Sequence, residues 1–488
     1  MKSINENFLK RGISYQFILV MIAAWAVVMT FMVPTWQTPD ENAHIAEIGR
    51  ALDNDNLSQA IMSDIDLQWL TIMSHPENKI NISEWKAAMT KSPDYDKSDC
   101  LPKGIHLLVI KHLPAVIGME IGIVCGLPSF WVMELAELFS VAFYIAICWI
   151  ALRIMPAKRE IMLFFMAFPM TIHQISSISY DAVLIPLIFL FIAYTMKLYD
   201  TDDHIGWKEY AIWAGILLLI TYIKMPYVAL GILFFGIPFE KTKMSIGKFQ
   251  IDGEFIHKYR WVLRGIIVLV IVAGLYYMRN NYFVALLYGM LGETKQLIRL
   301  FLATISNFGV FLLNSSVGNF GWLDTPLPNW FVFATYILLF VVTCRYIKNR
   351  NATMLTGKQI LVVLITFLAQ GFLLTTSMVN HTIMIILFGS EQAQATYNIK
   401  EAIYNIPYIG GLQGRYYLPI IPLFFLAIGK SVTTKKEQEK SVVYERVNWI
   451  VLGYVIVAAI LTIITLYHRY WQHKCHTTKE RNHVRRDE

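Results

Sequence analysis

The stretch ISYQFILVMIAAWAVVMTFMV, residues 13–33, decides the fold class of this chain. About 20 apolar residues in a row are enough for a helix to cross a hydrocarbon core of about 30 Å. The run follows the polar residues 1–12. We interpret it as a retained first membrane span rather than as a cleaved signal peptide.

The composition of the whole chain agrees with a protein that folds in lipid. Of 488 residues, 56% are hydrophobic and only 16% are charged, whereas an average soluble domain has about 25% charged residues. This excludes a disordered protein, a disulfide scaffold and an ordinary cytosolic enzyme. The net charge of +7 comes without a basic stripe interleaved with aromatic residues, so no nucleic-acid partner is predicted.

Ten further apolar runs predict an all-α polytopic integral membrane protein with about 11 transmembrane helices, in a range of about 9 to 13. The runs are residues 130–152, 161–176, 182–196, 210–223, 227–239, 262–278, 330–344, 360–388, 416–428 and 450–466. The mixed stretch 104–127 suits a helix that lies at the membrane interface.

The charges of the loops predict the orientation. The linkers 153–160, 240–261, 345–359 and 430–448 are rich in Lys and Arg and are expected to be cytoplasmic. The segment 35–103 carries twelve Asp and Glu against six Lys and Arg, and we expect it to form a large, partly helical extracytoplasmic loop. The tail, residues 468–488, is basic, and its side of the membrane stays open.

The first outer loop carries the leading candidates for catalysis. Residues 34–44 contain Pro39, Asp40, Glu41 and His44. Asp40 and His44 would share one face of a short helix, and a carboxylate at the bilayer edge can serve as a general base. The alternative is that Asp40 and Glu41 only favour the helix N-terminus through its dipole.

Four other outward points carry acids, cations and aromatic residues. Asp181 opens a span, where it could also be a simple N-cap, and Lys224 lies in a tight hairpin. Arg415 stands at the mouth of a span, where a guanidinium can grip phosphate or extend to lipid headgroups. Arg279 is a second phosphate ligand or a headgroup anchor. The remaining candidates on these loops are Trp322, Asp324, Gln413 and Tyr416.

Two other groups of polar residues have open interpretations. Glu134 and Glu137 share a helix face inside an apolar run and are either buried or interfacial. The tail holds His468, Cys475 and three further histidines, but their spacing matches no metal site. The five single cysteines suggest neither a zinc site nor a disulfide framework, so we assign no metal ligand.

The ordered set of motifs resembles the bacterial membrane family called domain of unknown function 2142. The motifs are residues 39–41 with His44, 169–170 and 179–181, Lys224 with 226–227, 321–324 and 414–416. The resemblance runs from about residue 25 to residue 428. That family is similar to the GT-C glycosyltransferases.

The resemblance implies how the chain is divided. Residues 1–430 form a GT-C-like transmembrane catalytic domain, with residues 35–103 as its first extracytoplasmic loop. Residues 431–448 are a cytoplasmic linker, residues 449–467 are the last transmembrane helix, and residues 468–488 are the tail.

The resemblance also implies inverting sugar transfer on the outer face of the bacterial plasma membrane, from a polyprenyl-phosphate-linked donor. Asp40 matches the catalytic acid position, with Glu41 as its neighbour, and Arg415 and Lys224 match cationic motif positions. We expect a cell-surface glycan or lipid-linked acceptor, such as a wall polysaccharide or teichoic acid, and addition of a side-branch sugar. A divalent cation, Mg²⁺ or Mn²⁺, is compatible but not required. The alternatives are a transporter or flippase of lipid-linked saccharides, and a polysaccharide polymerase.

Overall fold

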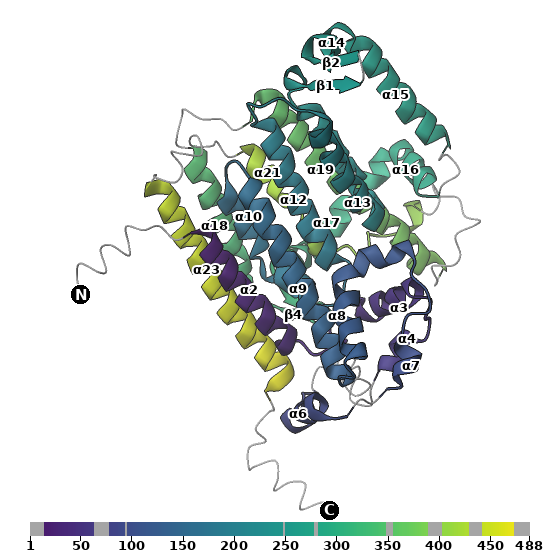
Figure 1. The fold of residues 1–488 in the computed structure, drawn as a ribbon, viewed down its shortest axis with the longest axis vertical. Helices are drawn as coiled ribbons and strands as arrows, with labels where there is room; N and C mark the ends of the chain where they lie inside the picture. The colour runs from purple at the N-terminus through teal and green to yellow at the C-terminus, as the bar shows by residue number, and fades with distance from the viewer. Residues whose placement is uncertain are drawn as a thin grey trace, which may run out of the picture.

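The structure, a computed structural model, describes residues 14–62, 78–92, 95–246, 249–277, 282–347, 355–388, 403–428 and 442–472. Within these residues the chain is mostly helical (Figure 1). Its strands form two short hairpins, β1 (Lys243–Ile246) with β2 (Phe249–Asp252) and β3 (Asn319–Phe320) with β4 (Thr325–Pro326). The expected all-α membrane class is therefore confirmed.

Seven helical stretches are long and apolar enough to cross a membrane. Five of them match predicted runs: α2 (Tyr15–Met32), α9 (Ser129–Ile154), α12 (Asp181–Tyr199), α19 (Gly357–Phe388) and α23 (Val442–Leu466). The other two are η1 with α8 (Leu107–His112 and Leu113–Val124) and α17 (Thr294–Val317). We expected residues 104–127 to lie at the interface, and the length and composition of Leu107–Val124 would also allow it to cross. Helix α17 was not predicted, because Lys295, Arg299 and Asn307 interrupt its apolar pattern.

Several predicted spans are shorter or broken, so the described residues do not support eleven spans. The run 161–176 is divided into α10 (Arg159–Met166) and α11 (Pro169–Ile175), because a proline restricts the residue before it and lacks an N–H. The run 227–239 forms a 3-10 helix, and the run 416–428 is divided between a 3-10 turn and a short α-helix. These elements are η2 (Met225–Gly236), η4 (Gly414–Tyr417) and α21 (Ile421–Ile428).

The polar segments gather at opposite ends of the bundle (Figure 1). The first loop forms α3 (Glu41–Ala51), α4 (Leu57–Ile61), α6 (Ile82–Thr90) and α7 (Lys97–Cys100) at one end. The β1–β2 hairpin and α14 (Gly253–Lys258) lie at the other. This arrangement agrees with the prediction that segments 35–103 and 240–261 face opposite sides of the membrane. The other described elements are η3 (Phe239–Lys241), α13 (Trp207–Ile223), α15 (Arg260–Tyr277), α16 (Tyr282–Gly292), α18 (Asn329–Ile347) and η5 (Tyr467–Trp471).

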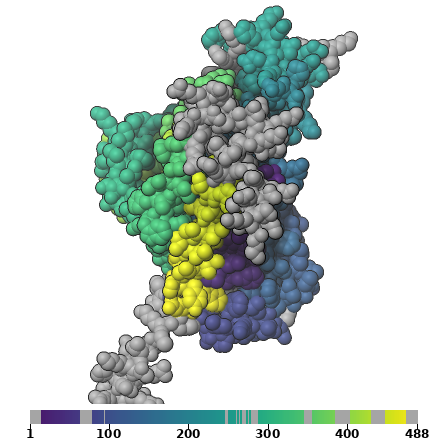
Figure 2. Space-filling model, turned by 90° about the vertical axis from the view of Figure 1, so that its left-hand side faces the viewer, coloured from purple at the N-terminus to yellow at the C-terminus, as the bar shows by residue number. Residues whose placement is uncertain are grey.

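The last helix, α23, ends beside the first loop. It runs along α2, and its lower end reaches the helices of the first loop (Figure 2). There the backbone N–H of Ile80 donates to the carbonyl of Tyr470 at 2.8 Å. The tail, whose side was left open, therefore begins at the same end as the first loop. Residues 473–488, and most of the predicted linker 431–448, lie outside the described residues.

The outer face of α23 is apolar and exposed, as expected for a surface that contacts lipid. Its large exposed side chains recur at helical spacing: Ile456, Val457, Ile460 and Ile464. The buried core lies on α10, α11 and α12, whose side chains are almost all inaccessible. Because the short helices α10 and α11 are enclosed by longer ones, they can hold polar groups near the bundle end.

Helices α8 and α9 pack closely because α8 carries glycine where the backbones meet. A Cβ atom on Gly118 would lie 2.2 Å from the carbonyl oxygen of Leu135, which is far inside contact distance. Small residues of this kind let membrane helices approach each other. On α13, by contrast, a Cβ atom added to Gly215 would have no neighbouring atom within 4 Å among the described residues.

We expect Gly118→Ala to destabilise the protein by about 1–3 kcal/mol, because the two helices must separate to accept the methyl group. The matched change Gly215→Ala should be neutral or slightly stabilising, since alanine favours a helix. Thermal unfolding in detergent measures both. Equal effects of the two substitutions would contradict the close packing.

Candidate functional site

The entry to α3 is a strained turn. Asp40, at the N-cap position, has φ of 66°, and Trp36 has φ of 71°, so both lie in the left-handed region. Such residues persist only where the surroundings hold them, and they cluster at functional sites. Asp40 makes no capping hydrogen bond with its side chain. Asp40 and Glu41 still lie at the N-terminus of α3, where the helix dipole favours negative charge, so the alternative interpretation is not contradicted.

The buried carboxylate of Glu41 holds this turn in place. It accepts hydrogen bonds from the backbone N–H of Trp36 at 2.7 Å and of Ile178 at 3.2 Å. The backbone of Thr38 and the side chain of Glu137 on α9 donate further hydrogen bonds. Burial raises the pKa of Glu41 to about 7, although these hydrogen bonds act in the opposite direction. Glu41 thus joins the first loop to the turn before α12.

Arg415 connects Asp40 to the interior of the bundle. Its guanidinium is buried and donates to Asp40 Oδ2 at 3.1 Å and to Gln174 Oε1 at 3.0 Å. The Asp40 side chain itself is 59% exposed, so it remains accessible from outside. Gln174, on α11, was not a candidate in the sequence analysis, and no sequence pattern marks it.

The position before Arg415 accommodates only a glycine, because a side chain there would meet another helix. A Cβ on Gly414 would lie 2.0 Å from the carbonyl oxygen of Leu312 on α17. The N–H of Gly414 donates to Ser315 Oγ at 2.8 Å. Because η4 is pressed against α17 in this way, the position of Arg415 is fixed by the fold.

A second cation lies beside the first. The Lys224 ammonium is 5.3 Å from the ring centroid of Tyr180 and 4.7 Å from that of Tyr416. The Arg415 guanidinium lies 5.4 Å from the same Tyr416 ring. The electron-rich ring between them favours both cations. Lys224, Arg415 and Tyr416 therefore form one cationic group at the end of the bundle.

The β3–β4 hairpin contacts the turn before α3 through Trp322. Trp322 Nε1 donates to the carbonyl of Trp36 at 3.1 Å, and Leu323 is another non-glycine residue with positive φ, at 65°. Asp324, however, accepts from Arg469 at 2.8 Å and from Thr325 at 3.0 Å. In the structure Asp324 connects the hairpin to the end of α23.

The other predicted site residues are distributed around this centre. Asp181 lies one position inside α12 and is half-buried, and Tyr180, not Asp181, is the N-cap. Gln413 immediately precedes η4, and its Oε1 is buried without a hydrogen-bond partner among the described residues. Arg279 lies outside the described residues.

Glu134 and Glu137, whose placement was open, are both buried on α9. Glu137 hydrogen-bonds Glu41, and Thr30 of α2 lies beside Glu134. The inner wall of the site therefore contains three acidic side chains, those of Glu41, Glu134 and Glu137.

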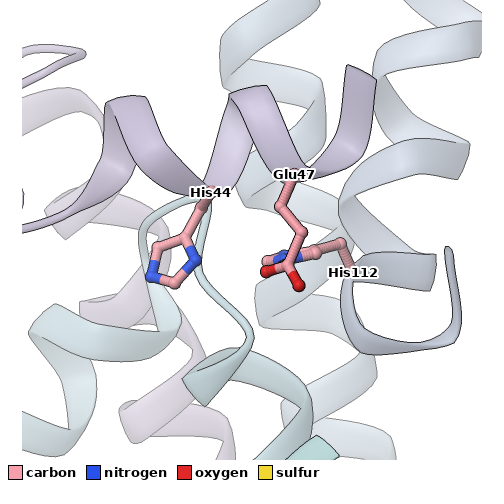
Figure 3. Close-up of side chains that lie close together, drawn as sticks. All are labelled: His44, Glu47 and His112. Atoms are coloured by element: carbon pink, nitrogen blue, oxygen red, sulfur yellow. The ribbon is translucent and has the colours of Figure 1, made fainter. Parts of the chain in front are cut away.

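A cluster of imidazole and carboxylate groups lies between α3 and η1 (Figure 3). His44, Glu47 and His112 place their potential ligand atoms within 4.8 Å of one another. His112 Nε2 donates to Glu47 Oε2 at 3.2 Å, and Lys111 donates to Oε1 at 2.8 Å. The sequence analysis missed Glu47 and His112. The spacing of His44 and Glu47 would have placed them on one helix face, but His112 has no local signal.

The ionisation of this cluster suits metal ligands. Burial, with the nearby His112, lowers the pKa of His44 to about 4. The hydrogen bonds from His112 and Lys111 lower the pKa of Glu47 to about 2, although burial opposes them. At neutral pH His44 is therefore a neutral imidazole and Glu47 a carboxylate, which are the forms that bind metal ions.

An apolar groove of about 560 Å³ begins next to the cationic group. Leu297, Ile305 and Leu312 of α17, with Phe367 of α19, line one part of it. Gly414 and Tyr417, on either side of Arg415 and Tyr416, line the other. The groove therefore lies among membrane helices, and two of its lining residues are close in the chain to Arg415 and Tyr416.

These features define a polytopic helical membrane protein with an acid–cation site at one end of its bundle. The family described as "Predicted membrane protein (DUF2142)" matches residues 19–424, and the chain belongs to this family. No curated protein and no solved structure was found to be similar to the chain.

The pKa of Glu41 makes the stability of the fold depend on pH. The group holds its proton more tightly in the folded chain, with a pKa of about 7, than at its ordinary value of 4.5. The folded state is therefore favoured below pH 4.5 and loses up to about 3 kcal/mol as the pH rises to 7. We expect Glu41→Gln to reduce this slope, measured as the unfolding midpoint in detergent between pH 5 and 8.

The control for this measurement is Glu84→Gln, which changes an exposed carboxylate on α6. It should keep the slope of the unmodified protein. If Glu41→Gln also kept the full slope, the buried carboxyl of Glu41 would not be the titrating group.

Proposed function

We propose that this chain is a membrane glycosyltransferase of GT-C type. It would move a sugar from a polyprenyl-phosphate-linked donor to a cell-surface glycan on the outer face of the bacterial plasma membrane, with inversion at the anomeric carbon. The observation that supports this most strongly is the pair of Asp40 and Arg415. An accessible carboxylate and a buried cation meet there at the end of a lipid-embedded bundle.

The two members of the pair suit the two charges of the reaction. The acceptor hydroxyl attacks the anomeric carbon, and its proton passes to a carboxylate as the bond to the leaving phosphate breaks. Asp40 is exposed enough to receive that proton. The leaving phosphate gains negative charge, which Arg415 and Lys224 stabilise. A phosphate that binds the Arg415 fork competes with Asp40 for the guanidinium and so releases the base.

The apolar groove supports a donor with a lipid tail. Its walls are almost wholly apolar, and Gly414 and Tyr417 connect them directly to Arg415. A polyprenyl chain in the groove would place its phosphate at the cationic group. Trp322 and Tyr416 would then flank the sugar, with Asp181, Gln413 and Asp324 near its polar edge.

The contacts of Glu41 and His44, the neighbours of Asp40, suit a structural role more than a chemical one. Glu41 is enclosed and already accepts several hydrogen bonds, so it is a positioning residue rather than a substitute base. His44 hydrogen-bonds Ser179 at 3.3 Å and is better placed to orient the turn than to contact an acceptor.

One observation favours a second candidate function, transport of lipid-linked saccharides. Glu134 and Glu137 are buried acids within a membrane-spanning helix, and such residues often serve proton or substrate pathways. A flippase would need these acids, whereas it would have no chemical use for Asp40. Asp40 therefore separates the two candidates.

We expect Asp40→Asn to lower transfer by about 10²–10⁴-fold, which is the usual contribution of a general base. The assay is surface-glycan composition and linkage in a deletion strain that carries the wild type or the variant. Asp55→Asn, which changes an exposed carboxylate in the same loop, is the matched control and should restore the glycan.

Two outcomes decide between the functions. If one sugar is lost and returns only with the wild type and the control, transfer through Asp40 is supported and the missing sugar identifies the donor. If Asp40→Asn restores the glycan but Glu137→Gln does not, transport becomes the better explanation.

The outward orientation is testable by labelling of single cysteines in intact cells. In a background without native cysteines, Glu84→Cys on α6 should react with a membrane-impermeant maleimide. Glu254→Cys on α14, also exposed, should react only after lysis, because it lies at the other end of the bundle. The reverse pattern would place the site in the cytoplasm.

A further inference from the structure

Outside the acid–cation pair, the outer end of the bundle brings together three metal-ligating side chains from two elements that are distant in sequence. His44 and Glu47 are on α3, and His112 is the last residue of η1. We propose that His44, Glu47 and His112 form a binding site for a zinc ion. The proposal concerns metal binding only, so it stands or falls independently of the glycosyltransferase function.

One pair of ligand atoms in the cluster has the separation expected in a zinc site. With zinc–ligand bonds of about 2.0–2.2 Å, the ligand atoms of a tetrahedral site lie about 3.3 Å apart. The distance from His112 Nε2 to Glu47 Oε2 is 3.2 Å, and the three ligand atoms lie within 4.8 Å of one another. The hydrogen bond from His112 to Glu47 thus occupies the position in which both atoms would bind an ion.

The ring of His44 is oriented for ligation. Its Nε2 contacts Ser179 Oγ at 3.3 Å, and Figure 3 shows the other ring nitrogen turned toward Glu47. Metal-bound histidines almost always donate their second ring N–H to a neighbouring oxygen. Ser179 supplies such an oxygen and leaves Nδ1 of His44 for the ion.

The ligand atom of His112 is already directed at that of Glu47. The His112 side chain is fully buried, and its Nε2, which donates to Glu47 Oε2 at 3.2 Å, is the nitrogen that would bind the ion. Lys111 holds Oε1 of Glu47 at 2.8 Å, which leaves Oε2 as the single ligand oxygen of this carboxylate.

Two imidazoles and one carboxylate favour zinc over magnesium or calcium, which prefer oxygen ligands. Three protein ligands leave the fourth tetrahedral position for water or another small ligand. The ion would also fasten α3, which begins at Asp40, to the outer end of the helical stretch Leu107–Val124.

The test is a zinc titration of the purified full chain in detergent, after removal of metals with a chelator, against a competing zinc indicator. The sequence of the tail contains His473, Cys475, His476 and His483, which could bind zinc themselves. All proteins in the test therefore carry alanine at these four positions. The starting protein should bind one zinc ion per chain.

The variants locate the ion. His112→Ala and Glu47→Gln should weaken zinc binding by about 100-fold or more, and Ser179→Ala by about 10–100-fold, as for other partners of ligating histidines. His106→Ala changes an exposed histidine on the same segment, paired with Asp53, and should leave the affinity unchanged. Far-ultraviolet circular dichroism of the metal-free proteins identifies any variant that fails to fold.

Cobalt provides a measurement that does not depend on variants. Cobalt(II) in place of zinc should give the intense visible absorption of a tetrahedral nitrogen–oxygen site. The proposal is overturned if the starting protein binds no zinc. It is also overturned if folded His112→Ala and Glu47→Gln bind zinc as tightly as that protein does, or if the cobalt spectrum is that of an octahedral, water-ligated ion.

Discussion

The end of the bundle that carries the first loop depends on one requirement: the buried guanidinium of Arg415 must be paired. A buried charge is tolerated only when it is hydrogen-bonded and compensated, and the two partners of Arg415 come from Asp40 and Gln174. These residues lie on three separate segments of the chain. Neutralising one cation therefore fixes the first loop, α11 and η4 relative to one another.

The backbone conformation of the turn around Asp40 is energetically unfavourable, and contacts with other segments stabilise it. Trp36 and Asp40 both have positive φ, which costs about 1–3 kcal/mol for each residue. Glu41 ties the turn to Ile178, and Trp322 reaches the carbonyl of Trp36. The result is a carboxylate that is held rigidly by its backbone while its side chain remains open to solvent, which suits a group that must receive a proton.

From the sequence, we predicted correctly the class of fold and that the motifs lie near one another. The number of membrane-spanning helices was not predicted correctly. Long apolar runs such as α2 and α9 were predicted because length and hydropathy are local properties. Helix α17 was missed because its polar residues interrupt the pattern, and Pro169 divides a run that looked continuous. Short helices enclosed by longer ones depend on tertiary packing, which a hydropathy pattern does not encode.

In the candidate site, too, residues within sequence motifs could be predicted, whereas residues that matter only through contacts with distant segments could not. The ordered motifs indicated Asp40, Lys224, Arg415 and Tyr416, and the structure brings these four residues together. Their catalytic and binding roles stay predictions. Gln174, Glu47 and His112 were not selected, because their importance comes from partners on other helices. Asp324 was selected for its motif, yet its carboxylate is engaged by Arg469.

The contact between Asp324 and Arg469 has a consequence for how the protein is made. Arg469 follows α23, the last helix described, whereas the turn at Asp40 follows the first. The first loop is therefore synthesised long before the hairpin that contacts Trp36 can be anchored. The contact between Asp324 and Arg469 forms only after α23 has been made, so the turn at Asp40 receives its full support late in synthesis.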